Sequence, residues 1–126
     1  MRKKLKSSLS ALESAQKIQR EVARLGFDWP NEKEVLKKIE EEIGEVRHAL
    51  RGRKRARVRE EIGDLLFTVA GLAQKAGFNA ERTLKGANRK FRDRFGRLEK
   101  ELHRKGKKFP QKLEVLDKLW NHVKRT

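Results

Sequence analysis

Apolar residues recur at intervals of three or four along most of this chain, the spacing expected when a helix buries one face. The first apolar stripe follows the pattern Ser10-x-x-Glu13, in which both side chains can satisfy free backbone N–H groups at a helix start. Its members are Leu12, Ala15, Ile18, Val22 and Leu25. Gly26 then favours a helix end, so we predict a first helix over residues 10–25.

Three longer apolar stripes and one short one follow. Asn31 and Gly52 bound the second predicted helix, whose apolar positions are Val35, Leu36, Ile39, Ile43, Val46 and Leu50. The third, over residues 56–76, has the broadest apolar face, which predicts a central helix with that face buried. The fourth begins at Asn79 and extends to about residue 104. After a break at 106–110, a short final helix carries Leu113, Leu116, Leu119, Trp120 and Val123.

These stripes predict an all-α fold, a bundle of four main helices plus a short C-terminal helix. We assign residues 1–8 to a basic N-terminal tail and residues 9–126 to a single domain, because no repeat or low-complexity linker interrupts the pattern. The apolar stripes are broader than one small bundle can cover. We therefore expect a homodimer.

The chain is strongly basic, which narrows its possible partners. It has 34 Lys and Arg against 18 Asp and Glu, a net charge of +16, which favours polyanions such as nucleotides or nucleic acid. It has no Cys, which excludes disulfides and thiolate metal sites and fits a cytoplasmic location. No apolar run approaches the roughly 20 residues of a membrane span. The basic start leads into Ser7 and not into an apolar segment, so we expect no signal peptide.

Carboxylates are concentrated in two short clusters on the second and third predicted helices, within residues 40–45 and 60–64. At about 100° per residue, two acids of each cluster project beside the apolar stripe of their helix. These acids are Glu42, Glu45, Glu61 and Asp64. Two adjacent antiparallel helices could gather them around one point, where their mutual repulsion would favour a bound cation. All-oxygen ligands suit a hard ion, Mg²⁺ or alternatively Mn²⁺.

Two other interpretations of the acidic residues stay open on the spacing alone. Charged residues three and four apart are also typical of solvated helix faces. Glu45-x-x-His48 resembles half of a di-iron carboxylate site, but the third helix offers Glu61-x-x-Asp64 and no His. Gly44 and Gly63 lie inside the clusters, where helix propensity would not place Gly, and this favours a functional site.

The acidic clusters read Glu41-Glu42-x-x-Glu45 and Glu61-x-x-Asp64, and characteristic segments flank them. These segments are Gly26-Phe-Asp-Trp29 and Ala87-Asn88-x-Lys90-Phe91-x-x-Arg94-Phe95. Together they resemble the MazG family of nucleoside triphosphate pyrophosphohydrolases, whose signature is Glu-Glu-x-x-Glu, a spacer, and Glu-x-x-Asp. The resemblance covers about residues 9–124 and is closest to the C-terminal catalytic domain of two-domain MazG proteins.

The resemblance implies an all-α enzyme, usually a dimer, that uses Mg²⁺ to convert an NTP or dNTP and water into the monophosphate and pyrophosphate. By motif position, the implied metal ligands are Glu42, Glu45, Glu61 and Asp64. Glu41 or Glu42 would activate the attacking water. The implied nucleotide contacts are Lys38, Arg57, Asp64, Lys90, Arg94 and Trp120.

A second function class is a basic helical nucleic-acid-binding or scaffold protein without catalysis. Its basis is the net charge and the exposed Lys and Arg segments, including residues 51–57. The acidic clusters have no role in that interpretation. No segment of the sequence encodes a readable base pocket, so the preferred nucleotide is left open.

Overall fold

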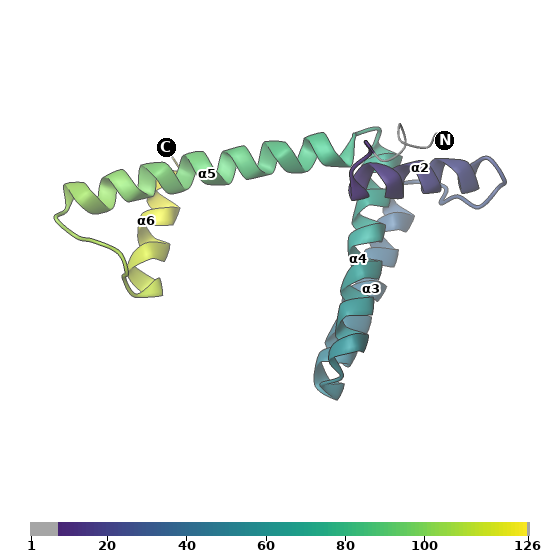
Figure 1. The fold of residues 1–126 in the computed structure, drawn as a ribbon, viewed down its shortest axis with the longest axis horizontal. Helices are drawn as coiled ribbons and strands as arrows, with labels where there is room; N and C mark the ends of the chain where they lie inside the picture. The colour runs from purple at the N-terminus through teal and green to yellow at the C-terminus, as the bar shows by residue number, and fades with distance from the viewer. Residues whose placement is uncertain (1–7, 126) are drawn as a thin grey trace. The chain divides into compact units, whose positions relative to one another are not determined.

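Five helices and no strand make up the part of the chain that the structure, a computed structural model, describes: residues 8–125 (Figure 1). They are α2 (Ala11–Ala23), α3 (Glu32–Gly52), α4 (Arg55–Ala76), α5 (Ala80–Arg104) and α6 (Leu113–Arg125). The predicted all-α class is confirmed, and the helices begin and end close to the predicted residues. The predicted basic tail over residues 1–8 lies outside the described residues, except for Ser8.

The helix ends follow from local chemistry. Ser10 Oγ accepts a hydrogen bond of 3.0 Å from the Glu13 N–H, and Glu13 Oε1 accepts one of 3.2 Å from the Ser10 N–H. Asn31 Oδ1 accepts from the Glu34 N–H at 3.0 Å and starts α3. Gly77 ends α4 with a φ of 90°, a left-handed conformation that favours Gly.

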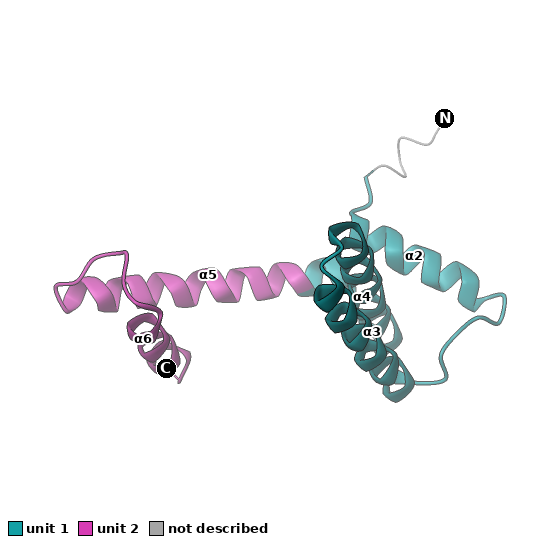
Figure 2. Ribbon diagram, turned by 90° about the horizontal axis from the view of Figure 1, so that it is seen from below, with its two compact units in different colours: residues 1–83 teal, residues 84–126 magenta. Residues whose placement is uncertain are grey.

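The first of two compact units, residues 1–83, contains α2, α3 and α4 (Figure 2). Here α4 packs against both α3 and α2, so it is the central helix of this unit. A buried glutamine on α2 fixes the packing: Gln16 Nε2 donates to the carbonyls of Ala70 and Phe78, at 3.2 and 2.9 Å. Gln16 Oε1 accepts from the Ala80 N–H at 2.9 Å. Every hydrogen-bonding atom of this buried carboxamide group therefore has a partner on α4 or just beyond it.

The second unit, residues 84–126, has its own apolar core between α5 and α6. Leu98 and Leu102 of α5 pack against Leu119 and Val123 of α6, and all four are buried. A row of aromatic rings extends from this core. Phe91 lies 4.9 Å from Trp120 between ring centroids, and Phe95 lies 5.5 Å from Phe109.

The predicted buried face of the third helix is only partly buried. Ile62, Leu66 and Val69 of α4 are all exposed. The reason is that α2 and α3 are its only neighbours within the described part of the first unit, and they cover other parts of its surface. Within residues 8–125, no helix has the length and apolarity needed to cross a membrane.

Candidate metal and nucleotide site

Three carboxylates from two neighbouring helices converge on one point in the first unit. Glu42 comes from α3, and Glu61 and Asp64 come from α4. One oxygen of each residue lies within 4.8 Å of the chosen oxygens of the other two. Glu42 and Glu61 are buried, each with an exposed fraction of 8%, whereas Asp64 is exposed. The antiparallel pairing of α3 and α4 brings Glu42 close to Glu61 and Asp64, which lie 19 and 22 positions later in the chain.

The spacing of these oxygens suits a hard divalent cation. Mg²⁺ binds oxygen ligands at about 2.0–2.1 Å, so oxygens at opposite corners of its octahedron lie about 4.2 Å apart. The observed limit of 4.8 Å is slightly wider, and small side-chain rotations would close it. Three carboxylates also leave corners of the octahedron for water and phosphate oxygens, as Mg²⁺ prefers.

Two cations of the chain flank the carboxylates. Lys38 Nζ lies 3.3 Å from Glu42 Oε1, one helical turn away on α3. Arg57 Nε lies 3.3 Å from Glu61 Oε2, one turn away on α4. The hydrogen bond from Lys38 to Glu42 raises the pKa of Lys38. Each buried carboxylate therefore has one basic partner on its own helix.

The environment of Glu61 disfavours its charge. Burial raises the pKa of Glu61 above its ordinary value of 4.5, and the neighbouring Asp64, Glu45 and Glu42 raise it further. Arg57 acts in the opposite direction and does not fully compensate. A bound cation would remove this penalty, because it favours the charged form of every carboxylate around it.

Two predicted acidic site residues lie outside the converging group. Glu45 is exposed, and its Oε2 lies 3.7 Å from Arg57 Nη2, although its charge still acts on Glu61. Glu41 is exposed as well, with Oε1 at 3.7 Å from Lys38 Nζ. The structure therefore brings together three of the four predicted metal ligands, and the ligand roles stay predictions.

Three predicted nucleotide contacts belong to the second unit. Lys90 is exposed on α5, Arg94 is half-buried one turn later, and Trp120 lies on α6. The Trp120 ring packs against Phe91 and against the apolar core of that unit. Trp120 therefore has a packing role that the structure shows, and the nucleotide roles of all three residues stay predictions.

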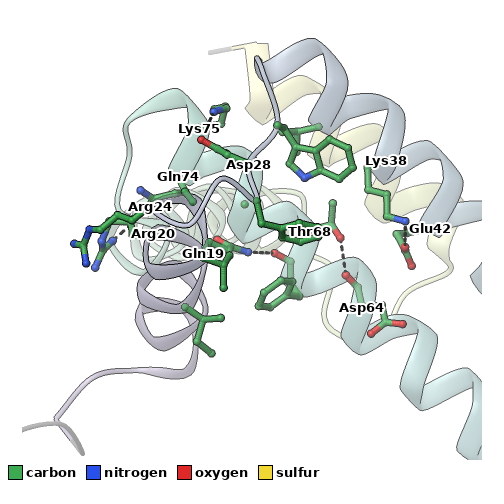
Figure 3. Close-up of a pocket in the computed structure, with 18 residues that line it drawn as sticks. Gln19, Arg20, Arg24, Asp28, Lys38, Glu42, Asp64, Thr68, Gln74 and Lys75 are labelled. Carbon is green, nitrogen blue, oxygen red and sulfur yellow. Dashed lines mark hydrogen bonds and ion pairs between the residues drawn. The ribbon is translucent and has the colours of Figure 1, made fainter.

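A pocket of about 880 Å³ adjoins the carboxylates within the first unit. Lys38, Glu42 and Asp64 form one end of it, and Arg20, Arg24 and Gln74 form the other (Figure 3). Its walls also include Phe27, Trp29 and Phe67. A volume of this size is typical of small-molecule sites.

Specific contacts fix the loop that lines one side of the pocket. Asp28 Oδ2, between Phe27 and Trp29, lies 3.0 Å from Lys75 Nζ of α4. The Phe27 N–H donates to the Val22 carbonyl at 3.0 Å. The loop after α2 is thus held against α4 beside the pocket.

Phe27, Trp29 and Gln19 line the pocket but were not among the predicted site residues. The available signal was a pair of aromatic residues in a short loop between two amphipathic helices, which is an unusual place for exposed apolar rings. Gln19 gave no signal, because its environment depends on a helix 48 residues away in the chain. Its Nε2 donates to the Phe67 carbonyl at 2.9 Å.

Comparison with known proteins places the chain in one family. It is 41% identical over 121 residues to the nucleoside triphosphate pyrophosphohydrolase of Escherichia coli (strain K12), covering 94% of this chain and 46% of that protein. It is 36% identical over 115 residues to the nucleoside triphosphate pyrophosphohydrolase/pyrophosphatase MazG of Thermotoga maritima, covering 90% and 44%. The chain thus spans about half the length of these relatives. The model of the MazG nucleotide pyrophosphohydrolase domain matches residues 31–97, which include both acidic clusters and more than half of the chain. The chain therefore belongs to the MazG nucleotide pyrophosphohydrolase family.

Proposed function

We propose that this protein is a Mg²⁺-dependent nucleoside triphosphate pyrophosphohydrolase. It would convert an NTP or dNTP and water into the monophosphate and pyrophosphate. The observation that carries the proposal is the convergence of Glu42, Glu61 and Asp64 within 4.8 Å at the end of a ligand-sized pocket. The two relatives described above carry the same activity in their names.

The proposed reaction breaks the anhydride bond between the α- and β-phosphates. The oxygen of a water molecule attacks the α-phosphorus, and pyrophosphate leaves with the bridging oxygen. Mg²⁺ held by Glu42, Glu61 and Asp64, with Glu45 as a further ligand, would polarise the phosphate and acidify the water. Mn²⁺, which also prefers oxygen ligands, is a possible substitute.

A carboxylate of the chain must accept the proton of the attacking water. Glu41 and Glu42 are the two proposed bases. Glu42 lies in the converging group, and Glu41 is exposed beside Lys38. The burial of Glu42 favours a role that needs a fixed position, whereas Glu41 is exposed and lies outside the converging group.

Basic side chains would hold the phosphates. Lys38 lines the pocket beside Glu42, and Arg57 lies beside Glu61. Lys90 and Arg94, one turn apart on α5, are the proposed partners of the leaving pyrophosphate. These cations would offset the negative charge that a triphosphate adds to a carboxylate site.

The direct test is product identification. The protein is incubated with each of the four NTPs and four dNTPs and Mg²⁺, and the products are separated by anion exchange. We expect equimolar monophosphate and pyrophosphate, and no reaction in the presence of EDTA. Release of orthophosphate alone, or no release from any nucleotide, would contradict the proposal.

We also propose that the protein acts as a homodimer in the cytoplasm. The dimer is supported by the exposed apolar side chains on α3 and α4, which include Leu36, Ile43, Leu50, Ile62 and Leu66. Light scattering coupled to gel filtration should give about twice the 14.8 kDa chain mass. The location follows from the proposed substrate, because nucleoside triphosphates are made and used in the cytoplasm.

Nucleic-acid binding is the second candidate, and the turn between α3 and α4 favours it. Arg51, Arg53, Lys54 and Arg55 are all exposed there. Arg53 also has a φ of 57°, a left-handed conformation that costs a non-glycine residue roughly 1 kcal/mol. An arginine at a position that favours glycine is consistent with a functional role for its side chain. Binding to single-stranded DNA or RNA should then weaken steeply with salt and should be lost in Arg51→Gln/Arg53→Gln/Arg55→Gln.

A further inference from the structure

The hairpin that joins α3 to α4 carries a dense group of cations. Residues 47–59 contain six arginines and one lysine, and no Asp or Glu. Arg57 pairs with Glu45 and Glu61 of the carboxylate site. The other six cations are exposed, and none of them has a carboxylate partner among residues 8–125. We name these six side chains the basic tip: Arg47, Arg51, Arg53, Lys54, Arg55 and Arg59.

The basic tip lies at the end of the α3–α4 pair that is remote from α2 (Figure 1). Gln16 and Gln19 attach α2 to the other half of α4, at the carbonyls of Ala70 and Phe67. Within the described part of the first unit, α3 and α4 therefore contact only each other at this end. Its cations are open to a large partner, and they lie apart from the pocket that α2 lines.

The basic tip departs from three local rules of stability. Arg53 has a φ of 57°, where Gly is favoured. Lys54 precedes α4 without a side-chain hydrogen bond, and the first turn of α4 has no acidic residue, although capping oxygens and carboxylates are favoured there. The clustered cations also repel one another. No contact in the first unit compensates for these choices, and such conflicts are expected where a sequence serves binding.

The chemistry of the basic tip matches a phosphate backbone. Five of its six cations are arginines, whose planar guanidinium groups can bind phosphate through two parallel hydrogen bonds. Residues 47–59 contain no Phe, Trp or Tyr, the rings that usually stack on the unpaired bases of single strands. A duplex carries one negative charge per about 1.7 Å of its axis, about twice the density of either strand alone. A tight group of cations with little to stack on bases therefore favours a duplex.

We propose that the basic tip binds the sugar–phosphate backbone of double-stranded nucleic acid, without reading its base sequence. The inference rests on the second candidate function given above, nucleic-acid binding, and names its partner. It does not depend on the pyrophosphohydrolase activity. Arg57 is left out of the basic tip, because its guanidinium group is engaged by Glu45 and Glu61.

Fluorescence anisotropy of labelled oligonucleotides tests the partner. The full chain is titrated into two DNA duplexes of unrelated sequence, an RNA duplex, and the separate strands of each, at several salt concentrations between about 50 and 200 mM. We expect both DNA duplexes to bind with the same affinity and more tightly than their single strands. The RNA arm distinguishes the two sources of a duplex. The logarithm of the association constant should fall with the logarithm of salt concentration, with a slope of about −5 for six phosphate contacts. Tighter binding of the single strands, or a clear difference between the two DNA sequences, would overturn the inference.

A pair of charge-matched variants tests the location. Arg51→Gln/Arg55→Gln should weaken duplex binding and reduce the magnitude of the salt slope by about 2, since each lost phosphate contact removes about 1. Lys105→Gln/Lys108→Gln is the matched control, because both lysines are exposed in the second unit and the net charge falls by the same amount. The control should bind almost as well as wild type. Equal weakening in the two variants would show that the duplex responds only to net charge, and the inference would be wrong.

Arg53→Gly separates binding from stability. Glycine relieves the left-handed backbone at this position and removes one cation. The Tm should therefore rise while the affinity for the duplex falls, and the rate of pyrophosphate release should stay unchanged. A merely structural role of Arg53 would change the Tm alone. Unchanged duplex affinity in both Arg53→Gly and Arg51→Gln/Arg55→Gln would overturn the inference.

The outcomes distinguish the proposals from one another. If the duplex binds at the basic tip but no NTP is cleaved, the inference stands and the proposed activity is wrong. If single strands and duplexes bind equally and both lose affinity in Arg51→Gln/Arg55→Gln, nucleic-acid binding stands and the duplex inference is wrong. Binding to phosphatidylglycerol vesicles but to no nucleic acid would overturn both and indicate a membrane surface as the partner.

Discussion

Arg57 Nε lies 3.3 Å from Glu61 Oε2, one helical turn away on α4. The same guanidinium group approaches Glu45 Oε2 at 3.7 Å. A fixed cation of the chain therefore stands beside the carboxylates that are proposed to hold Mg²⁺. The protein partly neutralises its own site, and this arrangement has opposite consequences for a metal ion and for a nucleotide.

Replacing Arg57 with Gln should strengthen Mg²⁺ binding and weaken nucleotide binding. The Arg57 side chain is 48% exposed, so solvent screens its interaction with the buried Glu61 carboxylate. Its loss should raise the Mg²⁺ affinity by up to about fivefold, as measured by calorimetry. Affinity for the Mg²⁺ complex of α,β-methylene ATP should fall, because a phosphate partner is lost. If the affinity for the nucleotide complex rises together with the Mg²⁺ affinity, Arg57 does not contact the nucleotide.

Removing a proposed metal ligand should abolish activity without unfolding the chain. Glu42→Gln and Asp64→Asn keep the side-chain shape but lose the charge. Each should weaken Mg²⁺ binding by at least about tenfold. Mutation of even the residues that hydrogen-bond to metal ligands typically lowers metal affinity by about 10- to 100-fold. Glu40→Gln is the matched control, because Glu40 is exposed on α3. Full activity of either ligand variant would remove that residue from the site.

Neutralising Glu61 should stabilise the protein when no metal is present. Burial and three neighbouring carboxylates raise the pKa of Glu61, so its charged form is disfavoured in the folded state. Glu61→Gln should therefore have a higher Tm than wild type at pH 7 in EDTA. Addition of Mg²⁺ should raise the Tm of wild type more than that of the variant. If the variant is less stable in EDTA, the pairing of Glu61 with Arg57 outweighs its burial and repulsion.

The second unit should lose a specific contribution to stability in acid. Arg104 donates two hydrogen bonds to the Glu101 carboxylate, at 3.0 and 2.8 Å, and these lower the pKa of Glu101 below 4.5. A lowered carboxyl pKa contributes stability that is present above the unfolded value and is lost as the pH falls through the folded value. The Tm difference between wild type and Arg104→Gln should thus be largest near pH 7 and should shrink below about pH 4. In Arg97→Gln, an exposed change on the same helix, the difference should stay small at every pH.

The glycines of the acidic clusters should tolerate alanine in the isolated chain. A Cβ added at Gly44 or Gly63 would meet no atom within 4 Å. Gly63→Ala should therefore raise the free energy of unfolding by about 1 kcal/mol through helix propensity. Gly77→Ala should lower it, because φ there is 90°. If Gly63→Ala destabilises the protein or dissociates the proposed dimer, a second copy of the chain packs close to Gly63.

Much of the fold follows from local sequence. The Ser10 and Asn31 caps, the glycines at 26 and 77 and the apolar spacing place each helix within a few residues. These signals are short-range, because a cap or a helical stripe depends on residues within one or two turns. The helical projection placed Glu42, Glu45, Glu61 and Asp64 beside the apolar stripes, since rotation about a helix axis is also a local property. Of these four, Glu42 and Glu61 are buried, whereas Glu45 and Asp64 are exposed.

The tertiary structure alone decided which of these residues meet. The sequence indicated four carboxylates, but the pairing of α3 with α4 brought three together and left Glu45 beside Arg57. The sequence could not reveal the pocket, because its walls come from α2, the following loop, α3 and α4. No local sequence pattern shows that these four segments lie close together. Residue types and helix faces are fixed by the order of the chain. The distance between faces and the shape of the cavity depend on how the helices pack, and packing is a property of the whole unit.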